Sequence, residues 1–93
     1  MSIRITAIRK PGDGPLHTAI TELKWIDEAN GQTDVIAREV LWHWIEGGGQ
    51  AYVRDKTNDI VFVAARENIY GTKFVQTYAD QTWKDNLLAL PRF

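Results

Sequence analysis

Two histidines are the first candidates for chemistry in this sequence. His17 follows a Gly-Pro stretch, His43 lies in a helix-like segment, and there is no cysteine. A catalytic histidine needs a nucleophile or an orienting carboxylate beside it, yet the only serine, Ser2, stands at the N-terminus. A metal site needs three or four converging ligands. We therefore expect no catalytic site, no metal and no cofactor, with His43 packing at a helix boundary and His17 in a loop.

Two carboxylates are the second candidate. Asp80 and Asp85 stand in one turn-rich segment, and paired carboxylates can perform acid–base chemistry when their surroundings separate their pKa values. The alternative, which we prefer, is that both accept backbone N–H groups in turns or caps. The glycines at 47–49 follow a helix-like segment, whereas phosphate-binding glycines precede a helix. The sequence therefore predicts a protein that is not an enzyme.

Composition places limits on the fold and on the partners. The chain has 93 residues, of which 44% are hydrophobic, so we expect one domain over residues 1–93. Eleven basic and twelve acidic residues give a net charge of −1, which offers no electrostatic reason to bind nucleic acid or an anionic membrane. No apolar run approaches the roughly 20 residues of a membrane span, and no signal peptide is recognisable. We expect a cytoplasmic protein.

One segment has clear helical periodicity. Residues 33–46 place an apolar stripe on one face of a helix, with Thr33 as the N-cap and the glycines at 47–49 as the stop. The stripe consists of Ile36, Ala37, Val40, Leu41, Trp44 and Ile45. We predict that this stripe faces a sheet.

The remaining segments predict strands. Two precede the helix, at 2–9 and 17–26, and three follow it, at 50–54, 60–65 and 72–78. Ile8 falls on the opposite face from Ile3 and Ile5, which indicates a bulge or a two-sided strand. The order β-β-α-β-β-β predicts an α+β fold, a mainly antiparallel sheet with one helix packed on one face. The apolar tail at 86–93 is expected to dock onto the core.

Several of these features resemble a known family. They are an N-terminal Ile-x-x-Ile strand, a helix ending in glycine, Ala51-Tyr52-Val53, Thr77-x-x-Asp80, and the ending Asp85-Asn86-Leu87-Leu88-x-Leu90-Pro91. Over nearly the whole chain the sequence is similar to a family of small bacterial and phage proteins, domain of unknown function number three-eight-nine-two. The resemblance implies a small stand-alone α+β domain, and it implies no activity or catalytic residues. Its distribution suggests a phage or mobile-element origin.

The predicted helix carries one feature that core packing explains poorly. Trp42 lies roughly 160° from Trp44 on a helical wheel of 100° per residue. Val35, seven residues earlier, would stack beside Trp42 on the outward face. An exposed tryptophan among charges is typical of an interface hot spot, so we predict a partner-binding surface formed by Val35, Arg38, Glu39, Trp42 and Glu46. The alternative is that the tail or a loop covers Trp42.

The sequence thus predicts a small non-enzymatic domain that binds a protein partner or a second copy of itself. The alternative is a nucleic-acid-binding domain that uses the sheet face, since single-strand binders stack bases on sheet aromatics. Basic and aromatic residues that could share such a surface are Arg4, Arg9, Lys10, Arg66, Lys73, Phe62, Phe74 and Tyr78. Given the net charge, we expect no appreciable nucleic-acid binding.

Overall fold

The structure of the chain is a computed structural model, and it describes residues 2–12 and 16–93. Residues 10–15, which two prolines and two glycines predict to be a loop, lie partly outside the described residues. The elements are β1 (Ser2–Arg9), the 3₁₀ helix η1 (His17–Ala19), β2 (Glu22–Ile26), β3 (Thr33–Ala37), α1 (Arg38–Glu46), β4 (Gln50–Arg54), β5 (Ile60–Glu67), β6 (Lys73–Ala79) and β7 (Thr82–Lys84).

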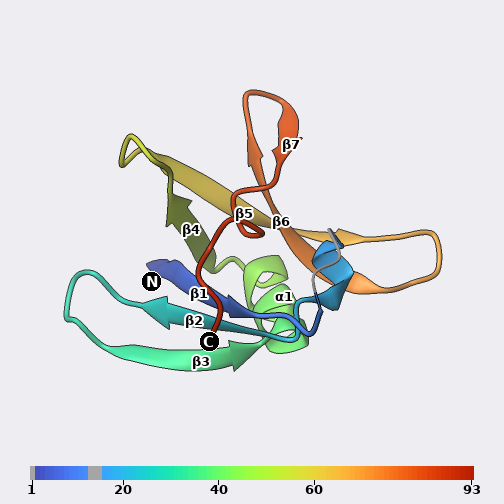
Figure 1. The fold of residues 1–93 in the computed structure, drawn as a ribbon, viewed down its shortest axis with the longest axis horizontal. Coiled ribbons are helices and arrows are strands. Elements are labelled where there is room, and N and C mark those ends of the chain that lie inside the picture. Colours follow the sequence, from blue (N-terminus) through green and yellow to red (C-terminus); the bar gives the residue numbers. More distant parts are fainter. Residues whose placement is uncertain (1, 13–15) are drawn as a thin grey trace.

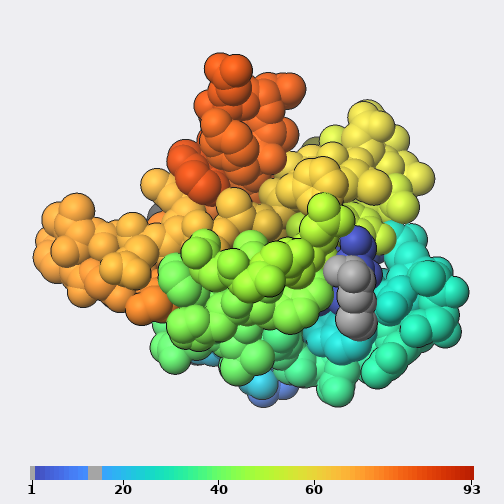
Figure 2. Space-filling view, turned by 180° about the vertical axis from the view of Figure 1, so that it is seen from behind, coloured from blue at the N-terminus to red at the C-terminus, as the bar shows by residue number. Residues whose placement is uncertain are grey.

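All seven strands belong to one sheet, in the order β3-β2-β1-β4-β5-β6-β7. Neighbouring strands are antiparallel except for β1 and β4, which are parallel. In Figure 1 the C-terminal segment crosses in front of β1, and Figure 2, seen from behind, shows α1 over the middle of the other side. The predicted α+β class, with a mainly antiparallel sheet and one packed helix, is confirmed.

The first part of the predicted helix is a strand instead. Residues 33–37 form β3, which pairs along its whole length with β2, and α1 begins only at Arg38 with Ala37 as its N-cap. Thr, Val and Ile are β-branched residues that favour strands. Asn30-Gly31 closes the hairpin between β2 and β3, with Gly31 at φ 77° and the Asp27 N–H bonded to the Gln32 carbonyl at 2.7 Å. An Asn-Gly turn between apolar segments is a strong hairpin signal.

A second strand, β7, was also missed. Asp80 and Gln81 both have positive φ values, 53° and 61°, which is the backbone of a two-residue type I′ hairpin turn. Ala79 pairs with Thr82 directly across this turn. Neither Asp nor Gln is the glycine that usually marks such a turn, so the hairpin had only a weak signature in the sequence.

Strand β1 contains the bulge that its sequence indicated. Its pairing with β2 shifts between Ile5 and Ala7, which leaves Thr6 as the extra residue. Because of this insertion, Ile8 returns to the face that carries Ile3 and Ile5, and all three are buried.

The core lies between the sheet, α1 and the C-terminal segment. Leu41 is the fully buried residue of α1, whereas Val40, its neighbour in the predicted stripe, is 59% exposed. The helix is thus rotated from the predicted orientation. At its C-terminal end the indole of Trp44 lies over Gly49, where an added Cβ would approach the ring to 2.3 Å. Glycine is therefore required at 49 by packing.

The tail is part of the fold, in agreement with the sequence. Leu87 is fully buried in the main hydrophobic cluster. The Ile8 N–H donates to the Pro91 carbonyl at 2.9 Å, and the Phe93 N–H donates to the Ile8 carbonyl at 3.1 Å. These two bonds attach the end of the chain to β1.

Candidate binding face on the sheet

One row of side chains crosses the sheet at a single level. In register, Arg4 of β1 is opposite Tyr52 of β4, Tyr52 is opposite Phe62 of β5, Phe62 is opposite Tyr78 of β6, and Tyr78 is opposite Trp83 of β7. Directly opposed residues place their side chains on the same face of a sheet. We call Tyr52, Phe62, Tyr78 and Trp83 the aromatic row.

The aromatic row points away from the core. Tyr52 alternates along β4 with Ala51 and Val53, and Phe62 alternates along β5 with Val61 and Val63. Ala51, Val53, Val61 and Val63 are all buried in the hydrophobic core. Since successive side chains on a strand point to opposite faces, the aromatic row belongs to the other face, which we call the outer face.

Three rings of the row are open to solvent. Phe62 is 51% exposed, Tyr78 42% and Trp83 38%. The rings of Tyr78 and Trp83 meet edge to face, with centroids 4.8 Å apart. Exposed aromatic side chains arranged side by side on a sheet offer a broad apolar contact surface.

Arg66 fixes one end of the row. Its guanidinium lies 4.1 Å from the centroid of the Trp83 ring and 5.4 Å from that of Phe74. Its Nη1 donates a hydrogen bond of 2.8 Å to Oε1 of Gln76. These contacts stack a cation on an indole and hold Trp83 in place on the short strand β7.

Tyr52, at the other end, is held by a polar contact. Its hydroxyl donates a hydrogen bond to Oε1 of Glu28, and Nε of Arg54 donates to the same oxygen at 3.2 Å. The hydrogen bond from Tyr52 is the main reason why the pKa of Glu28 is lowered. Burial, followed by the contact with Glu28, raises the pKa of Tyr52. Glu28 is therefore a carboxylate and Tyr52 a neutral phenol, and their bond orients the ring.

The predicted partner-binding surface does not form on a single helix face. Val35 lies in β3, opposite Lys24 of β2, whereas Trp42 lies in α1. The two therefore do not stack one above the other along a helix, because the residues between them change from strand to helix at Arg38. This part of the hypothesis is wrong, and the partner-binding role itself stays a prediction.

Trp42 is tied to the fold. It is half-buried against the core, and its indole Nε1–H donates to the carbonyl of Arg66 at 2.8 Å. Strand β4 pairs with β5 only as far as Val63. The Arg66 carbonyl that accepts from the indole therefore lies in the part of β5 that β4 does not pair with. The Lys73 ammonium lies 5.2 Å from the ring centroid. The Trp42 indole therefore joins α1 to β5.

The three charged residues of the predicted surface are split. The Arg38 guanidinium is turned inward, where Nη1 donates to the carbonyls of Thr18 and Ile20, the latter at 3.3 Å. Glu39 and Glu46 are exposed, and Glu39 lies 3.8 Å from the Arg38 guanidinium. Arg38 thus joins α1 to the segment around η1, and only the two glutamates remain on the open side of the helix.

His17 is buried, contrary to the prediction of a loop residue. Its Nε2 lies 4.0 Å from Oδ1 of Asp85 and makes no hydrogen bond among the described residues. Burial lowers the pKa of His17, while the charge of Asp85 opposes this shift and that of Arg66 adds to it. The hydroxyl of Ser2, the only serine in the sequence, donates to Oε1 of Gln50 at 3.0 Å. The other acidic candidate, Asp80, lies in the turn before β7, whereas Asp85 follows that strand.

Because the pKa of His17 is lowered in the folded state, the protein should lose stability in mild acid. The unfolded chain takes up the proton first as the pH falls through about 6.5, so the free energy of unfolding decreases from there down to the folded-state pKa. Urea melts between about pH 7.5 and pH 5.5 should show this decrease. His17→Gln should flatten the curve. Equal curves for the wild type and His17→Gln would contradict the assignment.

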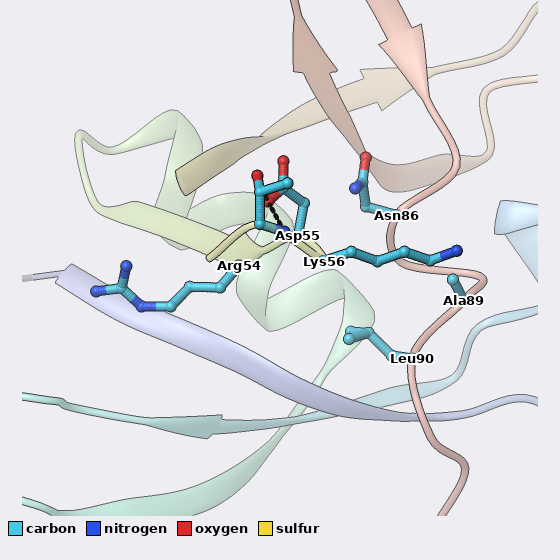
Figure 3. Close-up of a pocket in the computed structure, with 7 residues that line it drawn as sticks. Arg54, Asp55, Lys56, Asn86, Ala89 and Leu90 are labelled. Atoms are coloured by element: carbon cyan, nitrogen blue, oxygen red, sulfur yellow. Dashed lines mark hydrogen bonds between the residues drawn. The ribbon is translucent and has the colours of Figure 1, made fainter. Parts of the chain in front are cut away.

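An open hollow of about 530 Å³ lies between the β4–β5 loop and the C-terminal segment. Figure 3 shows Lys56 extending toward that segment while Arg54 points away from it. The Asp55 carboxylate accepts a hydrogen bond of 2.7 Å from the Thr57 hydroxyl, which is the main reason why the pKa of Asp55 is lowered. It also accepts from the N–H groups of Asp59 and Thr57, both at 2.9 Å, which lower the pKa further. These polar groups stabilise the loop and are not directed at a ligand.

Residues 2–12 and 16–93 contain neither a metal-binding cluster nor a membrane-spanning helix. No three His, Asp or Glu side chains come together there in a way that would hold a metal ion. In the same residues no helix has the length and hydrophobicity that crossing a membrane requires. The outer face with its aromatic row is thus the candidate site.

Comparison with known proteins places the chain in a family. The family model described as "Protein of unknown function (DUF3892)" matches residues 4–91. The chain belongs to the DUF3892 family. The match includes both the aromatic row and the ending Asp85–Pro91, which in this DUF3892 member supplies the buried Leu87. No match was found among curated proteins or among solved structures.

The sequence drew attention to only part of the row. Phe62 and Tyr78 were named for a sheet surface, together with Phe74, which is buried at 9% exposure. Tyr52 and Trp83 were missed. Alternation along β4 predicts that Tyr52 points to the other face from Ala51 and Val53. The local sequence does not show which residues of distant strands lie side by side with Tyr52.

Proposed function

We propose that this domain acts by binding a macromolecular partner through the outer face of its sheet, and not by catalysis. The observation that carries this proposal is the exposure of Phe62, Tyr78 and Trp83 in one continuous row. Exposed aromatic side chains held on rigid strands are the residues that dominate binding energy at interfaces. The candidates for chemistry, in contrast, are not gathered in one site: His17 lies 4.0 Å from Asp85, whereas Asp80 is in the turn between β6 and β7.

The partner predicted from the sequence is another protein or a second copy of the chain. The outer face supports this better than α1 does. Trp42 of α1 is half-buried and hydrogen-bonded, whereas Ile60 adds a further exposed apolar side chain, at 47%, beside the row. An apolar centre with polar residues around it is the usual anatomy of a protein interface.

The proposal is tested by removing the row's central rings. Phe62→Ala combined with Tyr78→Ala should weaken association by about 2 kcal/mol or more, roughly thirtyfold, as truncation of hot-spot residues does. The matched control is Ile69→Ala combined with Tyr70→Ala, because these side chains are 92% and 85% exposed in the β5–β6 turn, away from the row. Both variants should keep the wild-type melting temperature within a few degrees.

Two measurements report association. Light scattering over a concentration series detects a second copy, and affinity capture from a lysate, with and without nuclease, detects other partners. We expect Phe62→Ala/Tyr78→Ala to lose the self-association or the captured partner that the wild type shows. Ile69→Ala/Tyr70→Ala should keep it. Equal retention by both variants, or loss in the turn variant alone, would remove the outer face as the binding site.

A further inference from the structure

The net charge of −1 conceals an uneven distribution over the two faces of the sheet. Strand residues on the outer face are identified by their register with the aromatic row or by alternation from it. The basic ones are Arg4, Arg9, Lys24, Arg54 and Arg66, and the acidic one is Glu22. Glu22 forms an ion pair of 3.1 Å with Arg9. The strands thus present a strongly basic outer face.

The other acidic residues that the structure describes lie outside these strand positions. Asp34 and Glu67 alternate to the core side of their strands, Glu39 and Glu46 are on α1, and the rest of the described ones are in turns, loops and the tail. Glu28 is the loop carboxylate that approaches the outer face, and it is bound by Tyr52 and Arg54. On the strands of this face, five basic residues stand against one acidic residue, although the charges of the whole chain are nearly balanced.

The spacing of the rings limits how a flat ligand can contact the aromatic row. Adjacent strands lie about 4.8 Å apart, so a flat ligand cannot enter between rings of neighbouring strands and must stack on top of them. Phe62, Tyr78 and Trp83 offer such stacking positions across three strands. Arg66 lies at the edge of the row beside Trp83, where a guanidinium can meet a phosphate.

We propose that the outer face binds single-stranded nucleic acid, with bases stacked on the exposed rings of the aromatic row and phosphates near its basic residues. This inference rests on the proposed function and names the class of its partner. Base–aromatic stacking is sequence-tolerant because every base has a π-face. Bases of a duplex stack on each other, so only unpaired bases are free to lie on the row. The five basic residues on the strands of the outer face complement the negative charge of phosphates, and this favours nucleic acid over a protein partner.

The test uses the full chain and a fluorescently labelled single strand of about 12 nucleotides, long enough for a typical single-strand site. Anisotropy titrations should show saturable binding that weakens as salt is added. Tyr78→Ala should weaken binding about tenfold, the effect of losing one stacked base. Tyr78→Phe keeps the ring and should bind like the wild type. Tyr70→Ala, which removes an 85% exposed tyrosine of the β5–β6 turn, should also have no effect.

A second pair of variants tests the phosphates. Lys24 lies exposed on the outer face, and Lys56 is exposed in the β4–β5 loop. Lys24→Gln should reduce the slope of log affinity against log salt by about 0.7, the value for one phosphate contact on a single strand. Lys56→Gln should leave the slope unchanged. A duplex of the same sequence should bind more weakly than the single strand.

The possible outcomes separate this inference from the proposed function. Absence of saturable binding, tighter binding to duplex, or equal losses in Tyr78→Ala and Tyr70→Ala would overturn the nucleic-acid inference. If the oligonucleotide does not bind, yet the Phe62/Tyr78 variant loses a nuclease-resistant partner or a dimer, the partner is a protein and the proposed function stands. If neither oligonucleotide binding nor association with a partner is weakened by the substitutions in the aromatic row, both proposals are wrong.

Discussion

Leu41→Ala should lower the free energy of unfolding by about 2–5 kcal/mol, the range for leucine truncation in a packed core. Leu41 is the fully buried residue of α1. It packs into the cluster formed by the core side of the sheet. Its removal leaves a cavity between helix and sheet that rigid strands cannot close. Urea denaturation followed by far-UV circular dichroism measures the loss.

The neighbouring residue provides the control for Leu41. Val40 is 59% exposed, so Val40→Ala should change the free energy of unfolding by less than about 0.5 kcal/mol. The sequence placed both residues in one apolar stripe and would predict two comparable losses. Similar losses for the two variants would therefore show that α1 is oriented as its periodicity predicts, and not as the structure shows.

Leu87→Ala should cost a similar amount, about 2–5 kcal/mol, although it lies close to the end of the chain. Leu87 is fully buried, and the segment around it is held by several bonds. The Thr77 hydroxyl donates to Oδ1 of Asn86 at 3.2 Å, and Ile8 binds the backbone of the last three residues. Loss of the side chain should also free this segment, which faster amide exchange at Phe93 would report.

An exposed leucine separates burial from residue type. Leu16 is 62% exposed, and Leu16→Ala should leave the urea midpoint within the error of the wild type. If Leu87→Ala were as mild as Leu16→Ala, the tail would not belong to the core. Its attachment to β1 would then contribute little to stability.

Local patterns in the sequence determined most of the elements. Alternation predicted β1 and β4, and the misplaced Ile8 indicated a bulge. Three leucines in the tail predicted docking, because an apolar terminus has no other way to leave water. The glycines at 47–49 marked the end of α1. In each case neighbouring residues along the chain carry the whole signal.

Long-range pairing decided what local patterns left ambiguous. Residues 33–37 fit a helical stripe and a strand equally well by their apolar spacing, and the hydrogen bonds offered by β2 favour the strand. Because residues 33–37 form a strand, Val35 lies in β3 and does not stack beside Trp42 of α1. Strand β4 does not pair with β5 beyond Val63. The carbonyl of Arg66, further along β5, accepts a hydrogen bond from the Trp42 indole.

The sequence by itself determined that this is one α+β domain with a docked tail, since hydrophobic periodicity and turn chemistry are local properties. The candidate site was decided by the tertiary structure alone. Tyr52, Phe62, Tyr78 and Trp83 lie on four strands, and only the register between those strands places their rings side by side. The basic character of the outer face arises in the same way. Net charge is a sum over the chain, whereas a binding surface depends on which charges alternate to the same side of a paired strand.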